Sequence, residues 1–418
     1  MKFFQSPTLD ASHCSPSRAI RRVGIVGVGS MGAQIAAAHI ERGVPVVLAD
    51  ADPQALARAE DRIAHLLIDA GRQPAAQVIE SARRLIALSG DDAQLGQCDL
   101  VLESVAETET AKQQVYARLK PHLSPTTILA SNTSTIPIGR LAAQLADGRR
   151  FLGLHFLHPV DQRPLVEVIP GPQTSEATVA AAMAYVELLG KTPIGVVDRP
   201  GFLVNRLLMP YLSEAFELLL DGATVAEVER AAKDFGMGLG PLRLIDEIGL
   251  DTIVAGGRVV WQAFSGRINP SPLLVAMYKT GRWGRKSGAG FFAYPAGLGA
   301  REPGREDPAI DRLIADWARS PQVLSSQHIL NRLLLSMLLE ATRVLEDRQV
   351  RNPEIIDAAM VLGLGFPAAG GGLLRWADTL GAPRILEMLM ELEPLGQRFA
   401  PPELLRNLAA RGLPFHDR

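Results

Sequence analysis

A histidine and a glutamate stand on two neighbouring apolar runs of this chain. Residues 153–169, GLHFLHPVDQRPLVEVI, place His155 and Glu167 on strand-like runs joined by a polar turn that holds two prolines. If the two side chains face each other across such a hairpin, the carboxylate orients the imidazole and makes it a general base. The alternative is a core strand with a satisfied histidine and a glutamate that faces water. The choice between the two interpretations depends on the rest of the chain.

Upstream, a glycine-rich turn follows an apolar run. Residues 23–28 lead into Gly27, Gly29 and Gly32, an alanine-rich helical stretch and a second apolar run that ends at Asp50. In such a unit the first glycine permits a tight turn, the second lets the backbone approach a pyrophosphate, and the third lets helix pack on strand. A carboxylate about twenty residues further on accepts hydrogen bonds from the adenosine ribose and repels a 2′-phosphate. We therefore predict NAD rather than NADP as the cofactor; a tight turn without a ligand is the alternative.

Alternating strands and helices must position these residues. Buried strands are expected over residues 98–107, 126–135 and 150–160. Helical stretches lie between them, at residues 110–119 and 138–146. This alternation predicts a doubly wound parallel sheet, an α/β Rossmann-type domain, in which ligand-contacting residues gather at the carboxyl ends of strands. Glu107 and the SNTS turn at residues 131–134 lie at such ends.

The composition is that of an ordinary globular protein. The chain has 418 residues, 47% hydrophobic and 21% charged, which suffices for two or three domains. A formal net charge of −2 gives no bulk reason to expect nucleic acid or an anionic membrane as a partner. The two cysteines, Cys14 and Cys98, lack metal-ligand spacing, so we expect no metal site and a reducing compartment. Without a signal peptide or a long apolar run, the chain is expected to be cytoplasmic, with a loose tail over residues 1–20.

The C-terminal half contains an internal repeat. NRLLMPYLSEA at Asn205 and NRLLLSMLLEA at Asn331 are offset by 126 residues. Three more pairs share this offset, namely Glu214 and Glu340, Asp221 and Asp347, and Pro241 and Pro367. Both copies show helical apolar spacing, which predicts two all-α domains that arose by tandem duplication. We place the tail at residues 1–20, the Rossmann domain at 21–199, the first helical domain at 200–296, a linker at 297–324 and the second helical domain at 325–418.

Several motifs resemble those of the L-3-hydroxyacyl-CoA dehydrogenases of fatty-acid β-oxidation. They are the glycine turn with its aspartate, ASNTSTIPI, GLHFLHPVDQRPLVEVI, DRPGFLVNRLLMPYLSEA and WGRKSGAGFF. The ending, LGLGFPAAGGGLLRWADTLG, is similar to the second C-terminal repeat of the multifunctional fatty-acid oxidation enzymes, here without their hydratase domain. The resemblance therefore covers nearly the whole chain after the tail.

This resemblance assigns catalytic roles residue by residue. It implies that His155 is the catalytic base and Glu167 its orienting partner. It also implies that Ser134 contacts substrate and cofactor near the base and that Asn205 completes the hydrogen bonding on the substrate side. Without the family match, Ser134 is equally well read as a turn-forming hydroxyl and Asn205 as a helix cap.

The resemblance also implies a set of cofactor residues. Glu107, Lys112 and Lys286 match the residues with which the family holds the nicotinamide half of NAD. Taken alone, the two lysines are typical of solvated surface charges and Glu107 of a carboxylate at a helix N-terminus. The full set of expected cofactor residues is Gly27, Gly29, Ser30, Met31, Gly32, Asp50, Glu107, Lys112, Ser134, His158 and Lys286.

Two segments depart from the family pattern. His158 stands where the family usually has an asparagine near the nicotinamide. An imidazole replaces one hydrogen bond of the amide but not its donor and acceptor roles at once, and it becomes charged at low pH. We expect a shifted pH optimum or an altered cofactor affinity. Residues 366–372, FPAAGGG, stand where the multifunctional enzymes commonly have a larger aromatic residue and an arginine, and we expect this segment to concern packing or partner contacts.

Together these features predict an NAD-dependent, reversible 3-hydroxyacyl-CoA dehydrogenase. Three other functions stay open: an oxidoreductase for acyl carrier protein thioesters in a biosynthetic pathway, a dehydrogenase for a small free hydroxy acid, and a non-catalytic NAD-binding structural protein. In single-repeat relatives two chains pair through the helical domain, so the resemblance implies that the second repeat supplies this surface within one chain. A monomer and a homodimer both stay open, and a thiolase or a hydratase fits as a partner.

Overall fold

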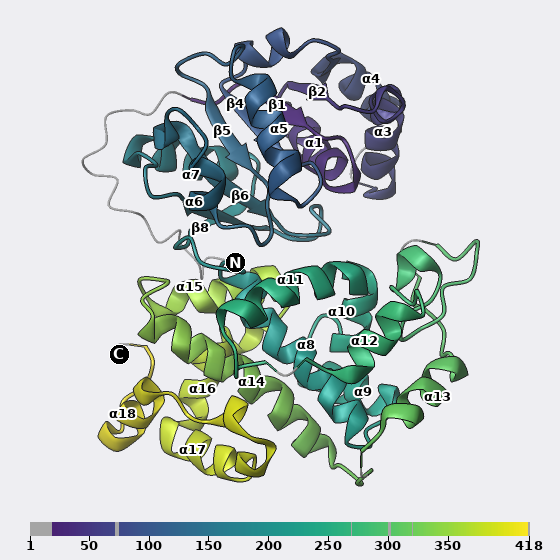
Figure 1. The fold of residues 1–418 in the computed structure, drawn as a ribbon, viewed down its shortest axis with the longest axis vertical. Helices are drawn as coiled ribbons and strands as arrows, with labels where there is room; N and C mark the ends of the chain where they lie inside the picture. The colour runs from purple at the N-terminus through teal and green to yellow at the C-terminus, as the bar shows by residue number, and fades with distance from the viewer. Residues whose placement is uncertain (1–18, 72–74, 269, 300–301, 320, 417–418) are drawn as a thin grey trace. The chain divides into compact units, whose positions relative to one another are not determined.

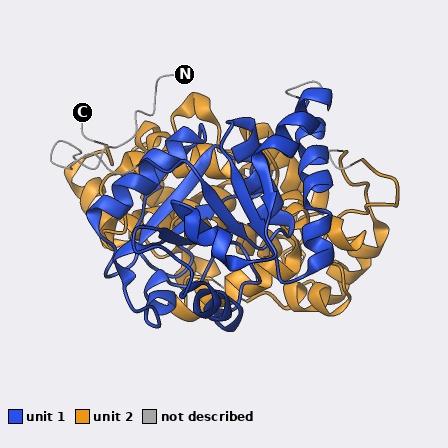
Figure 2. Ribbon diagram, turned by 90° about the horizontal axis from the view of Figure 1, so that it is seen from above, with its two compact units in different colours: residues 1–202 blue, residues 203–418 orange. Residues whose placement is uncertain are grey.

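The computed structural model describes residues 19–71, 75–268, 270–299, 302–319 and 321–416. The chain divides into two compact units, residues 1–202 and 203–418, which Figure 2 shows in two colours. Cys14 and nearly all of the expected tail lie outside the described residues, but Ile20 belongs to the folded unit, since its side chain is buried. In the described part of the chain, no helix is long and apolar enough to cross a membrane.

The first unit is built on an eight-stranded sheet (Figure 1) with the strand order β3-β2-β1-β4-β5-β6-β7-β8. Neighbouring strands run parallel, apart from β6 and β7, which are antiparallel. The doubly wound Rossmann-type domain that the alternation of runs predicted is therefore confirmed. The strands are β1 (Val23–Val26), β2 (Val46–Ala49), β3 (Ile86–Leu88), β4 (Leu100–Glu103), β5 (Ile128–Ser131), β6 (Phe151–Phe156), β7 (Leu165–Pro170) and β8 (Thr192–Gly195).

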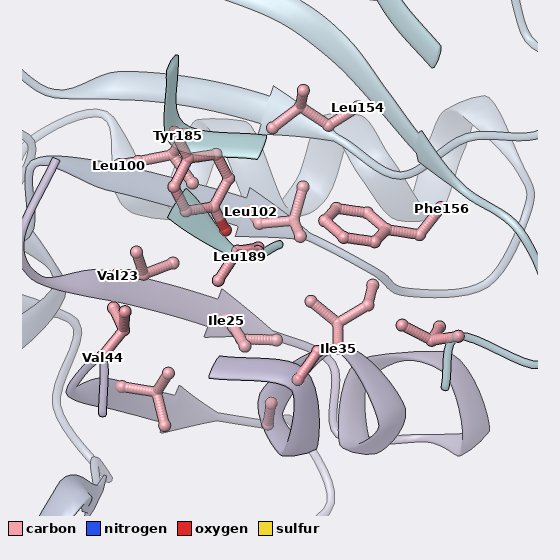
Figure 3. Packing of buried hydrophobic residues seen from close by; sticks show 14 of the residues in the cluster. Val23, Ile25, Ile35, Val44, Leu100, Leu102, Leu154, Phe156, Tyr185 and Leu189 are labelled. Atoms are coloured by element: carbon pink, nitrogen blue, oxygen red, sulfur yellow. The ribbon is translucent and has the colours of Figure 1, made fainter. Parts of the chain in front are cut away.

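Helices α1 (Ser30–Glu41) and α7 (Glu176–Leu188) cover one face of this sheet. Figure 3 shows Ile35 of α1 and Tyr185 of α7 packed with apolar side chains of β1, β4 and β6. The two helices also meet directly, because the buried His39 of α1 lies with Nε2 2.5 Å from the Tyr185 hydroxyl. Alternate residues of each strand point to this face, so the residues between them belong to the other face.

On that other face, α5 (Glu109–Leu119) and α6 (Ile138–Ala142) pack against the central strands. The ring of Tyr116 in α5 meets the ring of Phe151 in β6 edge to face, with centroids 5.4 Å apart. A Cβ at Gly153 of β6 would lie 2.7 Å from the side chain of Ile138 in α6. His155 follows Gly153 by two residues, so it shares this face.

Three helices that the sequence pattern did not predict stand between β2 and β3. They are α2 (Pro53–Ala57), α3 (Ala59–Asp69) and α4 (Ala75–Leu85). Asp52 caps α2 by accepting a hydrogen bond from the backbone of Gln54 at 2.9 Å. Helix α3 packs on the core with Ile63 and Leu67, while its other residues are mostly exposed. A short amphipathic excursion of this kind adds a layer without changing the sheet order.

Among the described residues, the second unit has two successive sets of five α-helices (Figure 1). The first set is α8 (Val204–Leu220), α9 (Val225–Phe235), α10 (Pro241–Ile248), α11 (Leu250–Ala263) and α12 (Pro272–Lys279). The second set is α14 (Ser326–Glu346), α15 (Pro353–Ala358), α16 (Leu373–Leu380), α17 (Ala382–Met390) and α18 (Glu403–Arg411). The sets correspond in order, as expected for the tandem duplication that the repeated motif predicted.

The long helices α8 and α14 of the two sets exchange buried ion pairs. Arg206 of α8 binds Glu340 (Nε–Oε1 2.5 Å) and Asp347 (Nη2–Oδ2 2.5 Å) of the second set. Arg332 of α14 binds Glu214 (Nε–Oε1 2.6 Å) and Asp221 (Nη1–Oδ2 2.9 Å) of the first set. Both guanidinium groups are buried, so each depends on the carboxylates of the opposite repeat for its charge partner.

In each repeat, one aspartate accepts backbone hydrogen bonds from a segment near the end of that repeat. Asp246 accepts hydrogen bonds from the backbone of Phe291 and Phe292, both at 2.9 Å. Asp378 accepts them from the backbone of Phe415 and His416, at 2.6 and 3.2 Å. These equivalent aspartates are 132 residues apart, against 126 for the helices α8 and α14.

The expected pairing of Pro241 with Pro367 is therefore wrong. Pro241 opens α10, but the corresponding α16 begins at Leu373. Helix α9 begins at Val225 and α15 at Pro353, 128 residues apart, so two of the six additional residues precede α15. The other four fall between α15 and α16, where the chain forms a π-helix (Ala359–Gly363) and a 3-10 turn (Ala368–Gly370). Phe366 in this segment is buried, and its ring meets that of Phe235 edge to face with centroids 5.4 Å apart. The FPAAGGG segment thus contributes to the packing between the two repeats.

The linker expected at residues 297–324 contains a helix, α13 (Pro308–Trp317). Asp307 caps it by accepting a hydrogen bond from the backbone of Ala309 at 3.0 Å, and Pro308 occupies its first turn, where no backbone donor is needed. The proline and glycine content of the preceding stretch predicted a linker, whereas the cap and the apolar residue Ile310, which is buried, favour a helix.

Candidate functional site

The antiparallel pair β6 and β7 brings the histidine and the glutamate together. His155 and Glu167 are direct partners in the strand register, so their side chains share one face of the sheet. His155 Nδ1 lies 2.6 Å from Glu167 Oε2, and both side chains are buried. The alternative of a water-facing glutamate is therefore wrong. Because the carboxylate occupies Nδ1, Nε2 is the ring nitrogen that could exchange a proton with a ligand.

Phe202, the last residue of the first unit, packs against this histidine. The two ring centroids are 5.8 Å apart, and the planes are tilted by 54°. Phe202 is fully buried and has a φ of 47°, a left-handed conformation that only its surroundings can hold in a non-glycine residue. The imidazole is thus fixed by Glu167 at one ring edge and packed by an aromatic ring on another side.

Three glycines shape the turn from β1 to α1, each in a different way. Gly27 has a φ of 95°, and a Cβ there would lie 2.5 Å from the Ser104 carbonyl oxygen. A Cβ at Gly32 would lie 1.8 Å from the Gly27 carbonyl oxygen, so helix and strand touch through backbone. A Cβ at Gly29 would meet nothing within 4 Å, which leaves open space beside the start of α1. Ser30 and Met31 follow in the first turn of the helix, exposed and half-buried respectively.

The turn has the properties of a dinucleotide cradle. Gly29 is the N-cap residue of α1 and has no side chain that could accept a hydrogen bond from the first backbone amides of the helix. Amides at a helix N-terminus can bind a phosphate group. Asp50, directly after β2, accepts a hydrogen bond from the backbone of Val28 (2.7 Å) with one oxygen and from Asp52 (2.9 Å) with the other. The carboxylate is half-buried, and it braces the glycine turn against the end of β2. These residues fit the pyrophosphate and ribose of NAD.

Glu107 holds the turn that carries Ser134. Its Oε1 accepts hydrogen bonds from Thr133 Oγ1 (2.7 Å), the Ser134 backbone (2.8 Å) and the Thr135 backbone (3.0 Å). Its Oε2 lies 3.2 Å from Lys112 Nζ. Burial opposes ionisation, but the charge of Lys112 and these hydrogen bonds outweigh it and lower the pKa of Glu107. The carboxylate is therefore an ionised clamp on the turn after β5.

Lys112 is fully buried, so the interpretation as a solvated surface charge is wrong. Its Nζ lies 2.9 Å from Glu103 Oε1 as well as 3.2 Å from Glu107 Oε2. Glu103, which no sequence motif indicated as a site residue, is itself fully buried at the end of β4. A charged residue that ends the apolar run LVLE was the available signal, since an ionised carboxylate enters such a run only with a partner.

His158 contacts the helix that begins at the glycine turn. Its Nδ1 lies 3.2 Å from Nε2 of Gln34 in α1, and Gln34 Oε1 accepts a hydrogen bond from the backbone of Val160 at 2.9 Å. Gln34 thus clasps the turn between β6 and β7 at two points. The residue that departs from the family pattern therefore links the hairpin of His155 to the helix of the cofactor cradle.

Two of the expected site residues belong to the second unit. Asn205 stands in the first turn of α8, which begins at Val204. Lys286 stands in a 3-10 turn (Arg285–Ser287), where its Nζ forms an ion pair with Asp251 and approaches Thr252 Oγ1 at 3.5 Å. Their roles toward substrate and cofactor stay predictions. Within the first unit, Ser134, Glu107 and Lys112 are brought together, as are His155 and Glu167.

Two family models match this chain. The model described as 3-hydroxyacyl-CoA dehydrogenase, NAD binding domain, matches residues 22–199. The model described as 3-hydroxyacyl-CoA dehydrogenase, C-terminal domain, matches twice, at residues 201–294 and 328–414. The first match confirms the NAD prediction, and the double match confirms the duplication.

Solved structures of two lengths are similar to the chain. The 3-hydroxybutyryl-CoA dehydrogenase of Escherichia coli K12 is 27% identical with a TM-score of 0.81, and the alignment covers 94% of this chain and 99% of that chain. The dehydrogenase part of multifunctional enzyme 1 from C. elegans is 26% identical with a TM-score of 0.71, covering 97% of this chain and 93% of that one. The (S)-3-hydroxybutyryl-CoA dehydrogenase of Ralstonia eutropha is 37% identical with a TM-score of 0.62, covering 66% of this chain and 100% of that one.

Proposed function

Because the chain belongs to the 3-hydroxyacyl-CoA dehydrogenase family of NAD-dependent oxidoreductases, we propose that it oxidises an L-3-hydroxyacyl-CoA reversibly, with His155 as the base. The observation that carries the proposal is the buried pair of His155 and Glu167, with Nδ1 and Oε2 2.6 Å apart. An imidazole held in this way has a defined tautomer, as general base catalysis requires. The two strands that carry the pair are hydrogen-bonded along their length, so the geometry persists without a ligand.

The glycine turn and Asp50 hold the cofactor in this proposal. The pyrophosphate rests on the open side of Gly29 at the start of α1, and Asp50 receives the adenosine ribose. Ser30 and Met31 line the same turn. The nicotinamide half of NAD is held by Glu107, Lys112, His158 and Lys286. When bound, NAD supplies the acceptor for the hydride that leaves the carbinol carbon.

The remaining chemistry is proton transfer by residues of this chain. His155 Nε2 takes the proton of the substrate hydroxyl, and the carboxylate of Glu167 at Nδ1 stabilises the imidazolium that forms. Ser134 donates a hydrogen bond to the reacting oxygen, because Glu107 fixes the backbone of its turn. Asn205, from the second unit, holds the substrate by its amide. In the reductive direction the same imidazolium returns the proton.

The substrate proposed first is a four-carbon acyl thioester of coenzyme A. Two of the similar enzymes are named for 3-hydroxybutyryl-CoA, and they align over 99% and 100% of their own lengths. The test is the decrease of NADH absorbance with acetoacetyl-CoA, compared with free acetoacetate and with the same acyl group on acyl carrier protein. We expect turnover with the CoA thioester and none with the free acid.

The matched variant is His155→Gln, which keeps the size of the side chain and removes the base. We expect kcat to fall by about 10²–10⁴-fold, the usual contribution of general acid–base catalysis, while NADH still binds. Wild-type protein that binds NADH but turns over no acyl thioester would overturn the proposal in favour of a non-catalytic NAD-binding protein. Equal rates for His155→Gln and wild type would remove His155 from its role.

A further inference from the structure

We propose that Glu103 is a positioning residue for this reaction, and that it acts through Lys112 and Glu107 on the turn that carries Ser134. The inference rests on the proposed function, which places Glu107 beside the nicotinamide and Ser134 at the reacting oxygen. Glu103 itself contacts neither substrate nor cofactor in this proposal. It holds Lys112, which holds Glu107.

The carboxylate of Glu103 is fully buried and fully hydrogen-bonded. Its Oε1 accepts from Lys112 Nζ and from the Val105 backbone, both at 2.9 Å. Its Oε2 accepts from the Tyr116 hydroxyl at 2.8 Å and from Ser131 Oγ at 2.7 Å. Four donors on a buried carboxylate hold it in one orientation and offset the cost of burying its charge. Such a group is a fixed point in the structure.

From this fixed point a chain of short contacts leads to Ser134. Lys112 is the central link, since its buried ammonium lies between Glu103 and Glu107. Glu107 in turn accepts the backbone hydrogen bonds of Ser134 and Thr135. Tyr116 and Lys112 stand one turn apart on α5, so one face of this helix presents both partners to Glu103. The chain joins the end of β4, helix α5 and the end of β5.

Glu103 also lies on the face of the sheet that carries the base. In the strand register Glu103 pairs with Ser131, and Ser131 pairs with Gly153 of β6. His155 follows Gly153 by two residues on the same face, about 6.8 Å further along the strand. The cluster therefore lies at the carboxyl ends of β4 and β5, one row before His155 on the longer strand β6.

The charges of the cluster do not cancel. Two carboxylates and one ammonium leave one net negative charge; Glu103 and Lys112 are fully buried, and the side chain of Glu107 is 34% exposed. The nicotinamide ring is cationic in NAD⁺ and neutral in NADH, so this charge favours the oxidised cofactor. Loss of the Glu103 charge should weaken NAD⁺ binding more than NADH binding, an effect that a purely structural residue does not predict.

Glu103→Gln is the informative variant, because it removes the charge and keeps the shape. The amide oxygen can still accept from Lys112, and its NH₂ can donate to the hydroxyls of Tyr116 and Ser131 in reversed hydrogen bonds. A neutral amide holds the ammonium of Lys112 less firmly than a carboxylate does, so Lys112, and with it Glu107 and the turn of Ser134, loses part of its fixed position. We expect kcat to fall by about ten- to a hundred-fold, as for a misplaced catalytic group, with KM changed far less.

Tyr116→Phe is the matched control. It removes one donor from the same carboxylate but leaves the charge of Glu103 and its contact with Lys112. Because three donors still hold the carboxylate, we expect kcat and the ratio of NAD⁺ to NADH dissociation constants to change far less than in Glu103→Gln. The variant Lys112→Met and the double variant with Glu103→Gln complete a cycle, in which the losses in kcat should be strongly non-additive because both residues act through one link.

The experiment measures steady-state kinetics with acetoacetyl-CoA, NAD⁺ and NADH dissociation constants by fluorescence, and thermal unfolding for the wild type and the four variants. A selective loss of kcat and a raised NAD⁺ to NADH ratio in Glu103→Gln support the inference. Unchanged kcat and ratio in a folded Glu103→Gln, or equal effects in Tyr116→Phe, overturn it. If wild type turns over no thioester, the proposed function fails, and the dissociation constants alone still decide whether Glu103 acts on the cofactor.

Discussion

Arg206 and Arg332 stand at equivalent positions of the two helical repeats, and each forms its buried ion pairs with carboxylates of the other repeat. Mutual exchange of this kind is the pattern of an isologous two-fold interface, in which each half offers the same patch to the other. Here both halves belong to one chain. Within the second unit, α8 and α14 thus cover each other in the way that the same helices of two identical domains would in a two-fold dimer.

Replacing either arginine should destabilise the protein strongly and to a similar degree. Arg206→Met leaves Glu340 without its shortest partner, and Arg332→Met does the same to Glu214. Glu340 keeps Arg267 at 3.1 Å and Glu214 keeps Arg398 at 2.9 Å, so part of each buried charge stays compensated. We therefore expect a loss of about 3 kcal/mol in each case, at the low end of the range for a broken buried ion pair, measured by chemical denaturation. The double variant Arg206→Met/Glu340→Gln should recover part of this loss. A loss below about 1 kcal/mol in both single variants would contradict the charge-pair account.

Two glycines of the cofactor turn should respond differently to the same substitution. Gly29→Ala meets nothing within 4 Å and keeps an allowed φ of −63°, so the protein should fold normally. The added methyl occupies the space proposed for the pyrophosphate, and we expect NADH affinity to fall by about ten-fold, roughly 1.4 kcal/mol. Gly32→Ala places a Cβ 1.8 Å from the Gly27 carbonyl oxygen and should lower the thermal stability instead. Thermal melts and NADH titrations of both variants decide the matter; a Gly32→Ala protein as stable as Gly29→Ala would contradict it.

His158 should make NAD binding depend on pH. An imidazole takes up a proton in the range where an asparagine stays neutral, and His158 sits on Gln34 of α1. We expect NAD⁺ affinity to fall on acidification in the parent protein and to stay flat in His158→Asn, as measured by fluorescence titration from pH 5 to pH 8. Gln34→Ala removes the contact and keeps the imidazole, so its pH dependence should persist. Superimposable curves for the parent and His158→Asn would remove the idea.

His416 should stabilise the second repeat at neutral pH and lose this effect in alkali. Burial lowers the pKa of His416, but Asp378, at 2.7 Å from Nδ1, and Asp357, at 3.0 Å from Nε2, outweigh it and raise the pKa to about 9. A raised folded-state pKa adds stability that is complete below the unfolded value near 6.5 and disappears as pH rises through 9. Denaturation of the wild type should therefore become easier between pH 6.5 and 9, and His416→Gln should flatten this slope. An equal slope in both proteins would show that the histidine is not the titrating group.

The fold of the first unit could be predicted because its signals are local. The β-branched run before Gly27, the helix after it and the alternation further on specify a parallel sheet, and the hairpin of residues 153–169 specifies its one antiparallel pair. The boundaries were less predictable. The expected strand of residues 98–107 ends at Glu103 in the structure, because Glu107 turns away to bind the loop after β5.

The burial of Lys112 could not be predicted from local pattern. Its neighbours along α5 are mostly polar, and a lysine on a polar helix is usually solvated. Its burial depends on two carboxylates, Glu103 and Glu107, that reach it from the end of another element. Charge compensation between segments appears only when the segments are placed in space. The sequence also did not reveal that the offset between the repeats rises from 126 to 132 residues. Pro241 and Pro367 match by chance at the offset of 126, although α10 begins at Pro241 and α16 at Leu373.

The hairpin that carries His155 and Glu167 restricts how this enzyme can change in evolution. Successive side chains of a strand alternate between faces, so a slip of one residue between β6 and β7 would set Val166 or Val168 opposite His155 and turn the carboxylate to the far side of the sheet. Insertions and deletions in the connecting turn are tolerated only if they leave that register intact. The connecting turn, which holds His158, can therefore change only in ways that keep His155 opposite Glu167.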